Sequence, residues 1–329
     1  MDCTEDCRKL YNAFKGLGTR EKDIIDVIGR RTLQQRHQIR LRYMDLYRED
    51  LVDVLNKELS GDFRQLAKYL FFGPIQVLAL QLYKIMKTPE TASVALVNII
   101  CCCSPSELSV LKKVYVEVLE AKGADDKSRT LVKDVEKETK GNLREYMRLF
   151  LNTERKAFPF TQLQSAATTG NWETLINLGD AERSAERIFA AVDTRTKSTD
   201  ETTILQIIAK ANILEIRVMY DHFMDTYNQT IVDFISKHVK KPLRHALNTT
   251  IMAAVDMRLL LVAQLYNSLY GLKLDVPTLS RIFILRSDTD LKTLRSIFEQ
   301  KMGSSLVDMV REETSGDYQD LLLALLTSE

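Results

Sequence analysis

Hydrophobic residues recur along this chain every three or four positions, which is the spacing of a helix with one buried face. The N-terminal part contains four such groups: Ile24, Ile25 and Ile28; Ile39, Tyr43, Leu46 and Tyr47; Leu51, Leu55 and Leu59; and Phe63, Leu66 and Leu70. The groups are separated by breaks at residues 16–19, 31–32 and 59–62. No stretch alternates apolar and polar residues for long enough to predict a strand. The pattern therefore predicts an all-α protein.

Two polar segments have the composition of helix starts. Thr19, followed by acidic and basic residues, can cap the free N–H groups of a helix that begins beside it. The segment Ser104-Pro105-Ser106-Glu107 combines a hydroxyl cap, a proline at the first helical position and a glutamate at the third. We expect a helix to begin at each place.

One unit recurs four times along the chain. Residues 51–63 return as residues 306–318, and the same offset of 255 aligns Arg31 with Arg286 and Gly16 with Gly271. Two fainter copies begin at Leu131 and Ile231. Within the first copy, Arg31 and Asp53 are a candidate ion pair, echoed by Arg286 and Asp308 in the fourth.

The spacing of the copies predicts the domain organisation. The second and third copies are farther apart than the others, which indicates a linker between them. The predicted segments are a first repeat at 1–73, a second at 74–151, a linker at 152–182, a third repeat at 183–256 and a fourth at 257–329. We expect the repeats to group two and two around the linker.

Composition narrows the functional classes. With 46 basic against 45 acidic residues, the net charge of +1 gives no overall field for nucleic acid. The acidic N-terminus is unlike a signal peptide, no apolar run approaches the roughly 18 residues of a membrane span, and five clustered cysteines suit a reducing compartment. His37, His222 and His245 have no serine or cysteine in a nucleophile motif nearby. We therefore expect a cytoplasmic protein that is not an enzyme.

The sharpest local feature is a glycine loop followed at a distance by an acid. Gly16 and Gly18 interrupt the first repeat, and Glu58 comes about forty residues later. Glycines let a short loop turn its carbonyl oxygens outward, and Ca²⁺ takes six to eight oxygen ligands that include carbonyls and carboxylates. By itself the motif is better explained as a plain turn between helices and a solvated glutamate. No G-K-[ST] sequence follows the glycines, so a phosphate loop is disfavoured.

Four helical units that carry K-G-L-G-T at residues 15–19, E-L-S-G-D-F at 58–63 and E-T-S-G-D-Y at 313–318 resemble the annexin family over essentially the whole chain. The resemblance implies four repeats of about five helices each that form a curved disc. It further implies calcium loops on the convex face, and peripheral, reversible binding of anionic phospholipid without enzyme activity.

The resemblance also implies site residues in the first repeat. The calcium ligands would be the carbonyls of Phe14, Gly16 and Gly18 and the carboxylate of Glu58, with a weaker second position at Thr19 and Glu21. The lipid contacts would be Leu17 at the loop tip, with Lys15 and Arg20 near phosphate.

The other repeats depart from the family pattern. The weaker fourth-repeat site would use Leu269, Gly271, Lys273 and Glu313, where Lys273 replaces a glycine and repels Ca²⁺. The second repeat keeps Glu138 but has no glycine at residues 88–91, so we expect no site there. The third repeat has residues 196–199 at the loop position and His238 at the acid position, so its calcium site looks lost. The edge of this repeat is basic instead, with Lys237, Lys240, Lys241 and Arg244. That edge is either a solvated surface or a calcium-independent contact with anionic lipid or a filament.

The leading hypothesis is calcium-dependent, peripheral binding of anionic phospholipid, in which Ca²⁺ bridges loop carbonyls and a carboxylate to lipid phosphate. The alternative is a structural protein that associates with cytoskeletal filaments or assembles with itself, with calcium secondary. We expect a monomer in solution that reaches membranes when calcium is high, with assembly on membranes left open.

Overall fold

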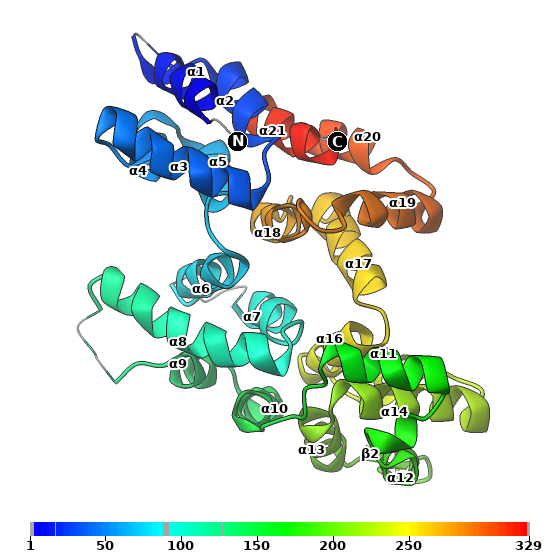
Figure 1. The fold of residues 1–329 in the computed structure, drawn as a ribbon. Helices are drawn as coiled ribbons and strands as arrows, with labels where there is room; N and C mark the ends of the chain where they lie inside the picture. The colour runs from blue at the N-terminus through cyan, green and yellow to red at the C-terminus, as the bar shows by residue number, and fades with distance from the viewer. Residues whose placement is uncertain (1–2, 17, 88–91, 125, 127, 328–329) are drawn as a thin grey trace. The chain divides into compact units, whose positions relative to one another are not determined.

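The computed structural model describes residues 3–16, 18–87, 92–124, 126 and 128–327. Its architecture confirms the all-α prediction, with five helices in each repeat (Figure 1). The first repeat contains α1 (Thr4–Phe14), α2 (Glu21–Ile28), α3 (Leu33–Tyr47), α4 (Leu51–Glu58) and α5 (Gly61–Tyr69). The second contains α6 (Pro74–Ile85), α7 (Ala92–Ile100), α8 (Pro105–Ala121), α9 (Leu131–Glu138) and α10 (Gly141–Asn152).

The predicted linker has secondary structure of its own. It contains α11 (Phe160–Thr169) and the short 3₁₀ helix η2 (Trp172–Thr174). The third repeat then contains α12 (Leu178–Ala190), α13 (Glu201–Lys210), α14 (Ile213–Tyr227), α15 (Ile231–His238) and α16 (Leu243–Val255). The fourth contains α17 (Met257–Tyr270), α18 (Val276–Arg286), α19 (Leu291–Met302), α20 (Leu306–Glu313) and α21 (Gly316–Thr327).

One small addition to the helical prediction lies in the third repeat. Strands β1 (Val192–Asp193) and β2 (Ser198–Thr199) form an antiparallel hairpin between α12 and α13. Val192 pairs with Thr199 in it, and Asp193 pairs with Ser198. Two residues per strand are too few for the sequence to show an alternating pattern.

Polar residues at helix starts behave partly as predicted. Ser104 forms a complete capping box with Glu107 and Pro105 opens α8, as the sequence indicates. A helix does begin beside Thr19, as α2 starts at Glu21, but Thr19 is not its cap: Arg20 is the N-cap, and no side-chain capping hydrogen bond is made there. The Thr19 hydroxyl donates instead to the Glu21 carboxylate.

Two compact units make up the chain, and they do not divide it at the linker. Unit 1 contains residues 1–77 and 261–329, so it joins the first and fourth repeats, and unit 2 contains residues 78–260. The expectation that the repeats group two and two around the linker is therefore wrong in its pairing. Helix α21 lies against α2 and α5, which brings the end of the chain back to its beginning (Figure 1).

Apolar faces of the helices form the core of unit 1. Leu10, Ile28, Leu66 and Leu321 are fully buried, and each such side chain contributes about 1.5–3 kcal/mol. Helices α2 and α21 approach closely at Gly29, where an added Cβ would lie 2.7 Å from the Cβ of Ala324. The first and fourth repeats thus share one continuous core.

A charged residue is buried inside unit 1. The Arg36 side chain is 2% exposed, and it donates from Nε to the carbonyl of Ile28 at 2.9 Å and from Nη1 to that of Leu70 at 3.3 Å. The Asp288 carboxylate lies 4.0 Å from the guanidinium. Burial lowers the pKa of Arg36 to about 10, against the opposing charge of Asp288.

Unit 2 has a comparable core between the second and third repeats. Tyr146, Phe150 and Phe223 are among its largest fully buried side chains. The Tyr146 hydroxyl shares a hydrogen bond of 2.6 Å with Thr250, so the repeats are joined by a polar contact as well as by apolar burial.

The candidate ion pair between Arg31 and Asp53 is wrong. Arg31 donates from Nε to Asp6 at 2.8 Å, and this hydrogen bond raises the pKa of Arg31. Arg286 pairs with Asp290, on the turn that follows its own helix, rather than with Asp308. Among the described residues, no helix is long and apolar enough to cross a membrane.

Candidate functional site

The glycine loop of the first repeat has a backbone that glycine adopts easily and other residues do not. Helix α1 ends at Phe14, and Gly16 and Gly18 follow with φ of +120° and +84°. The N–H of Arg20 donates to the carbonyl of Ala13 at 3.0 Å and closes the loop. The positive φ values explain why this loop contains two glycines.

The predicted carbonyl ligands carry unused acceptor capacity. Phe14 is the last residue of α1, where carbonyls have no partner within the helix. Within the described part of the chain, no N–H or side chain donates to the carbonyls of Phe14, Gly16 or Gly18. These three oxygens remain free to bind an external partner.

The predicted carboxylate is also free. Glu58 is the last residue of α4 and is exposed, and its side chain makes no hydrogen bond or ion pair with the described residues. Among the described residues, therefore, no hydrogen bond or ion pair joins the Glu58 side chain to the glycine loop. The last residues of the equivalent helices are Glu138, His238 and Glu313, so the structure places all four predicted acid positions at one point of the repeat.

The remaining first-repeat residues surround the start of α2. Thr19 and Glu21 are brought together by their side-chain hydrogen bond. The exposed Arg20 guanidinium lies 3.3 Å from Asp23, and the Lys15 ammonium lies 6.0 Å from the ring centre of Tyr11. The predicted lipid contact Leu17 lies outside the described residues.

The loop of the fourth repeat is closed in the same way but has a different backbone. The N–H of Asp275 donates to the carbonyl of Ser268 at 2.9 Å, which matches the bond from Arg20 to Ala13. Gly271 and Lys273, however, have no positive φ, and a Cβ on Gly271 would lie 3.0 Å from the carbonyl of Asn267. The fourth loop therefore lacks the glycine conformations of the first.

The side chains of the fourth-repeat site divide between core and surface. Leu269 is buried in α17, and only its carbonyl oxygen could bind a cation, because its hydrocarbon side chain has no donor atom. Glu313 ends α20 and lines a pocket of about 320 Å³, together with Leu274 and Asp317. Burial and the charges of Glu21 and Asp320 raise the pKa of Asp317, which shows that acidic groups gather here.

Sequence reasoning does not single out two exposed apolar residues at this loop. Tyr270 is 68% exposed and Leu272 is 112% exposed, the highest value among the exposed large hydrophobic residues described. Leu272 follows Leu17 by the repeat offset of 255, so the repeat itself was the signal that could have identified it.

The second and third repeats offer no comparable glycine loop. Residues 88–91 of the second repeat lie outside the described residues, while Glu138 is half-buried at the end of α9. In the third repeat the hairpin β1–β2 takes the place of the loop and His238 takes the place of the acid. No group of three or more His, Cys, Asp or Glu side chains suited to a metal ion occurs in the described residues, so any cation here would depend mainly on backbone oxygens.

Known proteins match this architecture along its whole length. The family model for annexins matches residues 5–70 and 261–325, which lie in the first and fourth repeats. Annexin A13 of Schistosoma japonicum is 32% identical over 328 residues, which are 100% of this chain and 92% of the relative. The chain belongs to the annexin family. Annexin A13 of Mus musculus is likewise 32% identical, over 99% of this annexin and 95% of the relative.

Solved annexin structures share the fold. Calcium-bound annexin (Sm)1 superposes with a TM-score of 0.85 at 29% identity and covers 99% of this chain and 90% of its own. Chicken annexin V gives a TM-score of 0.81 at 26% identity, with 100% and 96% covered. Annexins as a family are known for calcium-dependent phospholipid binding and are generally non-enzymatic.

Proposed function

We propose that this annexin binds anionic phospholipid membranes peripherally when calcium is present, mainly through its first repeat. The observation that carries the proposal is the loop after α1, where two glycines hold positive φ and three carbonyls have no described partner. Glu58 adds a carboxylate that makes no described contact. Neutral carbonyl oxygens with one carboxylate form a donor set that suits Ca²⁺.

The residues that would hold the ion supply part of its coordination. Phe14, Gly16 and Gly18 would contribute carbonyl oxygens and Glu58 a carboxylate, while Thr19 and Glu21 would form a weaker position beside them. Bound Ca²⁺ would join these oxygens to a lipid phosphate. A single carboxylate implies weak affinity without lipid, on the order of 10⁻⁴ to 10⁻³ M. Since each ligand strengthens the binding of the other, the membrane raises the affinity for calcium.

Other residues would contact the lipid itself. Lys15 and Arg20 are exposed beside the first loop and would meet phosphate groups, and Leu17, which lies between the two glycines in the sequence, would contact the lipid. Tyr270 and Leu272 present apolar surface at the fourth loop, where Leu269, Gly271, Lys273 and Glu313 would form a weaker calcium site. The protein would be cytoplasmic, and monomeric until it reaches a membrane.

Sedimentation with phosphatidylserine vesicles over a calcium titration tests this function. We expect the wild type to pellet with calcium, and Glu58→Gln to need at least roughly tenfold more calcium, because the variant loses a charged ligand. Glu138→Gln is the matched control, since it changes the same position of a repeat without the glycine loop. Equal calcium requirements for all three proteins would remove the first repeat from the mechanism. No pelleting at millimolar calcium would leave the filament-associated alternative, which co-sedimentation with filaments in EDTA examines.

A further inference from the structure

In the third repeat, a hairpin that exposes cations lies where the first repeat has its glycine loop. Arg195 and Lys197 are both exposed in the turn between β1 and β2, and Lys197 has φ of +55°. The Asp193 carboxylate accepts the N–H groups of Arg195 and Thr196 at 2.8 and 3.3 Å. This acid therefore shapes the turn through the backbone.

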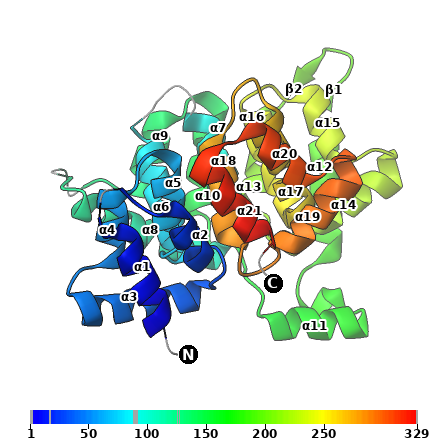
Figure 2. The ribbon, with the colours of Figure 1, turned by 90° about the horizontal axis from the view of Figure 1, so that it is seen from above.

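Two hydrogen bonds connect the hairpin and the start of the following helix, α13, to the end of α15 and the turn after it. The Thr199 hydroxyl donates to the carbonyl of His238 at 3.1 Å, and the N–H of Lys240 donates to the Glu201 carboxylate at 3.1 Å. Figure 2 shows the hairpin β1–β2 next to α15. Exposed lysine side chains lie on both parts of this region: Lys237 in the last turn of α15, and Lys240 and Lys241 in the turn that follows. The cationic surface is defined as these three lysines with Lys197.

Nearby acids are occupied elsewhere. Asp200 caps α13 through the N–H and hydroxyl of Thr203, and Glu201 also accepts from the side chain of Asn142. Within the described residues, no carboxylate lies within 4.0 Å of an ammonium group of the cationic surface. Burial and the charge of Lys237 lower the pKa of His238, so the residue at the acid position is neutral near pH 7.

We propose that the cationic surface of the third repeat contacts the phosphate groups of an anionic lipid surface directly, without calcium. Lysine ammonium groups are point charges with three donors each, and they suit phosphate oxygens. In the first repeat the corresponding loop and helix end offer carbonyls and Glu58, which need Ca²⁺ to meet phosphate. In the third repeat the positive charge belongs to the protein. The inference rests on the proposed function in taking the membrane as the partner.

The test is vesicle sedimentation in EDTA at low ionic strength. The patch variant carries Lys197→Gln, Lys237→Gln, Lys240→Gln and Lys241→Gln. The control variant removes four other exposed lysines: Lys113→Gln, Lys122→Gln, Lys292→Gln and Lys301→Gln. Each lysine near an anionic membrane strengthens binding about fivefold, so the patch variant should bind phosphatidylserine vesicles more weakly than the control variant, by roughly 25-fold if two of its lysines reach the surface and by about 600-fold if all four do. Binding by the wild type should also fall as salt is raised.

Several results would overturn the inference. These are no wild-type pelleting in EDTA, equal pelleting of the patch and control variants, or equal pelleting on neutral phosphatidylcholine vesicles. Competition by millimolar inorganic phosphate with no preference for vesicles would assign the surface to free phosphate. Co-sedimentation with filaments that is lost in the patch variant, without vesicle binding, would assign it to a filament.

The experiments can reject the cationic contact and the proposed function independently of each other. Calcium-dependent pelleting that responds to Glu58→Gln, with nothing in EDTA, keeps the proposed function and removes the cationic contact. Pelleting in EDTA that responds to the patch variant, with no added effect of calcium, keeps the cationic contact and removes the calcium mechanism. Thermal unfolding of every variant identifies any that fails to fold.

Discussion

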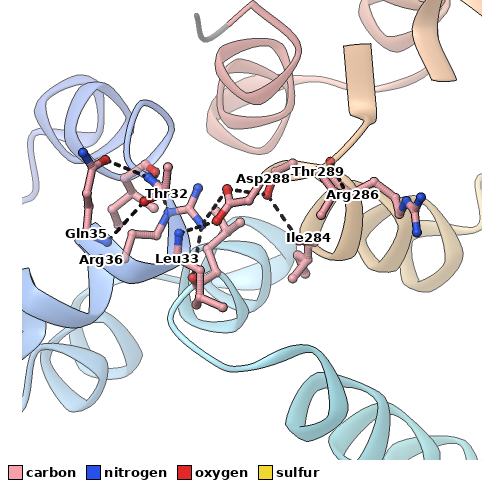
Figure 3. A network of polar contacts seen from close by, with 11 residues as sticks. Thr32, Leu33, Gln35, Arg36, Ile284, Arg286, Asp288 and Thr289 are labelled. Atoms are coloured by element: carbon pink, nitrogen blue, oxygen red, sulfur yellow. Dashed lines mark hydrogen bonds and ion pairs between the residues drawn. The ribbon is translucent and has the colours of Figure 1, made fainter. Parts of the chain in front are cut away.

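The Asp288 carboxylate accepts a hydrogen bond from the backbone N–H of Leu33, 255 residues earlier in the chain (Figure 3). That separation equals the offset between the first and fourth repeats, so the two residues occupy equivalent positions. Leu33 begins α3, whose first N–H groups have no partner within the helix. The fourth repeat therefore supplies a hydrogen-bond acceptor for the first N–H of α3. The same Asp288 carboxylate faces the buried Arg36.

Removing this carboxylate should destabilise unit 1. Asp288→Ala leaves the Leu33 N–H without its acceptor and Arg36 without its nearest acid. We expect the free energy of unfolding to fall by about 1–3 kcal/mol. Urea unfolding followed by circular dichroism measures it. Glu299→Ala is the control, because Glu299 makes a surface ion pair with Arg295 at 3.0 Å and should cost no more than about 0.5 kcal/mol. A loss for Asp288→Ala as small as the control's would contradict the role assigned to this contact.

The close approach of α2 and α21 predicts a second loss of stability. In Gly29→Ala the new Cβ would lie 2.7 Å from Ala324, and the helices must move apart. We expect a cost of about 1–3 kcal/mol in thermal or urea unfolding. Gly73→Ala is the control, because nothing lies within 4 Å of a Cβ placed there.

A compensating change distinguishes this clash from other causes. Adding Ala324→Gly to Gly29→Ala restores the space between the helices and should recover part of the lost stability. Strictly additive losses in the double variant would mean that the two positions do not interact, and the packing explanation would fail.

How much the sequence predicts depends on how local the relationship is. Ser104 and Glu107 are three residues apart, so their capping box follows directly from the sequence. The fixed offset likewise places Glu58 and Glu313 at equivalent helix ends. These predictions need only the geometry of one helix or one repeat.

Partners from distant segments were not predictable in the same way. The first repeat contains several acids that could pair with Arg31. The packing of α1 decides that its partner is Asp6 rather than Asp53. The pairing of the first repeat with the fourth depends on contacts such as Gly29 with Ala324, which no local pattern indicates. The candidate calcium ligands rest on the glycine loop and the family resemblance together, because carbonyl oxygens leave little trace in side-chain identity.

Acid should weaken unit 2 through His245. Its Nε2 lies 2.9 Å from Oδ1 of Asn98, and burial, with a smaller effect of Lys241, lowers its pKa below the ordinary 6.5. The unfolded chain therefore binds this proton more readily, so stability is full above about pH 6.5 and falls as pH drops below it. The loss should be at most about 1.4 kcal/mol per pH unit.

Comparison of His245→Gln with the wild type at pH 7 and pH 5 measures this effect. The glutamine amide can still donate to Asn98 but does not titrate in this range. The His245→Gln variant should lose less stability between the two pH values than the wild type. His37→Gln, at an exposed site, should lose as much stability as the wild type. A wild-type loss unchanged in His245→Gln would assign the acid sensitivity to another group.

The backbone of the first loop should control the calcium requirement. Gly16→Ala places a side chain at φ +120°, which L residues rarely adopt, so the loop must change shape. We expect the calcium concentration for half-maximal vesicle binding to rise at least severalfold. Gly303→Ala imposes strain at φ +68° after α19 and should lower stability without changing that concentration. Equal calcium curves for both variants would show that the loop backbone does not hold the ion.

The exposed tip of the fourth loop should contribute to membrane affinity without binding calcium itself. Leu272 is fully exposed, so Leu272→Asp should leave the free energy of unfolding nearly unchanged. Burying a leucine in an apolar medium is worth about 1.5–3 kcal/mol, so loss of that contact should weaken vesicle binding at saturating calcium by roughly tenfold or more. Leu41→Asp is the matched control, because Leu41 is 56% exposed within α3 and is not part of a candidate calcium loop. If the two aspartate variants bind equally well, Leu272 does not enter the lipid, and the fourth repeat would depend on its polar groups alone.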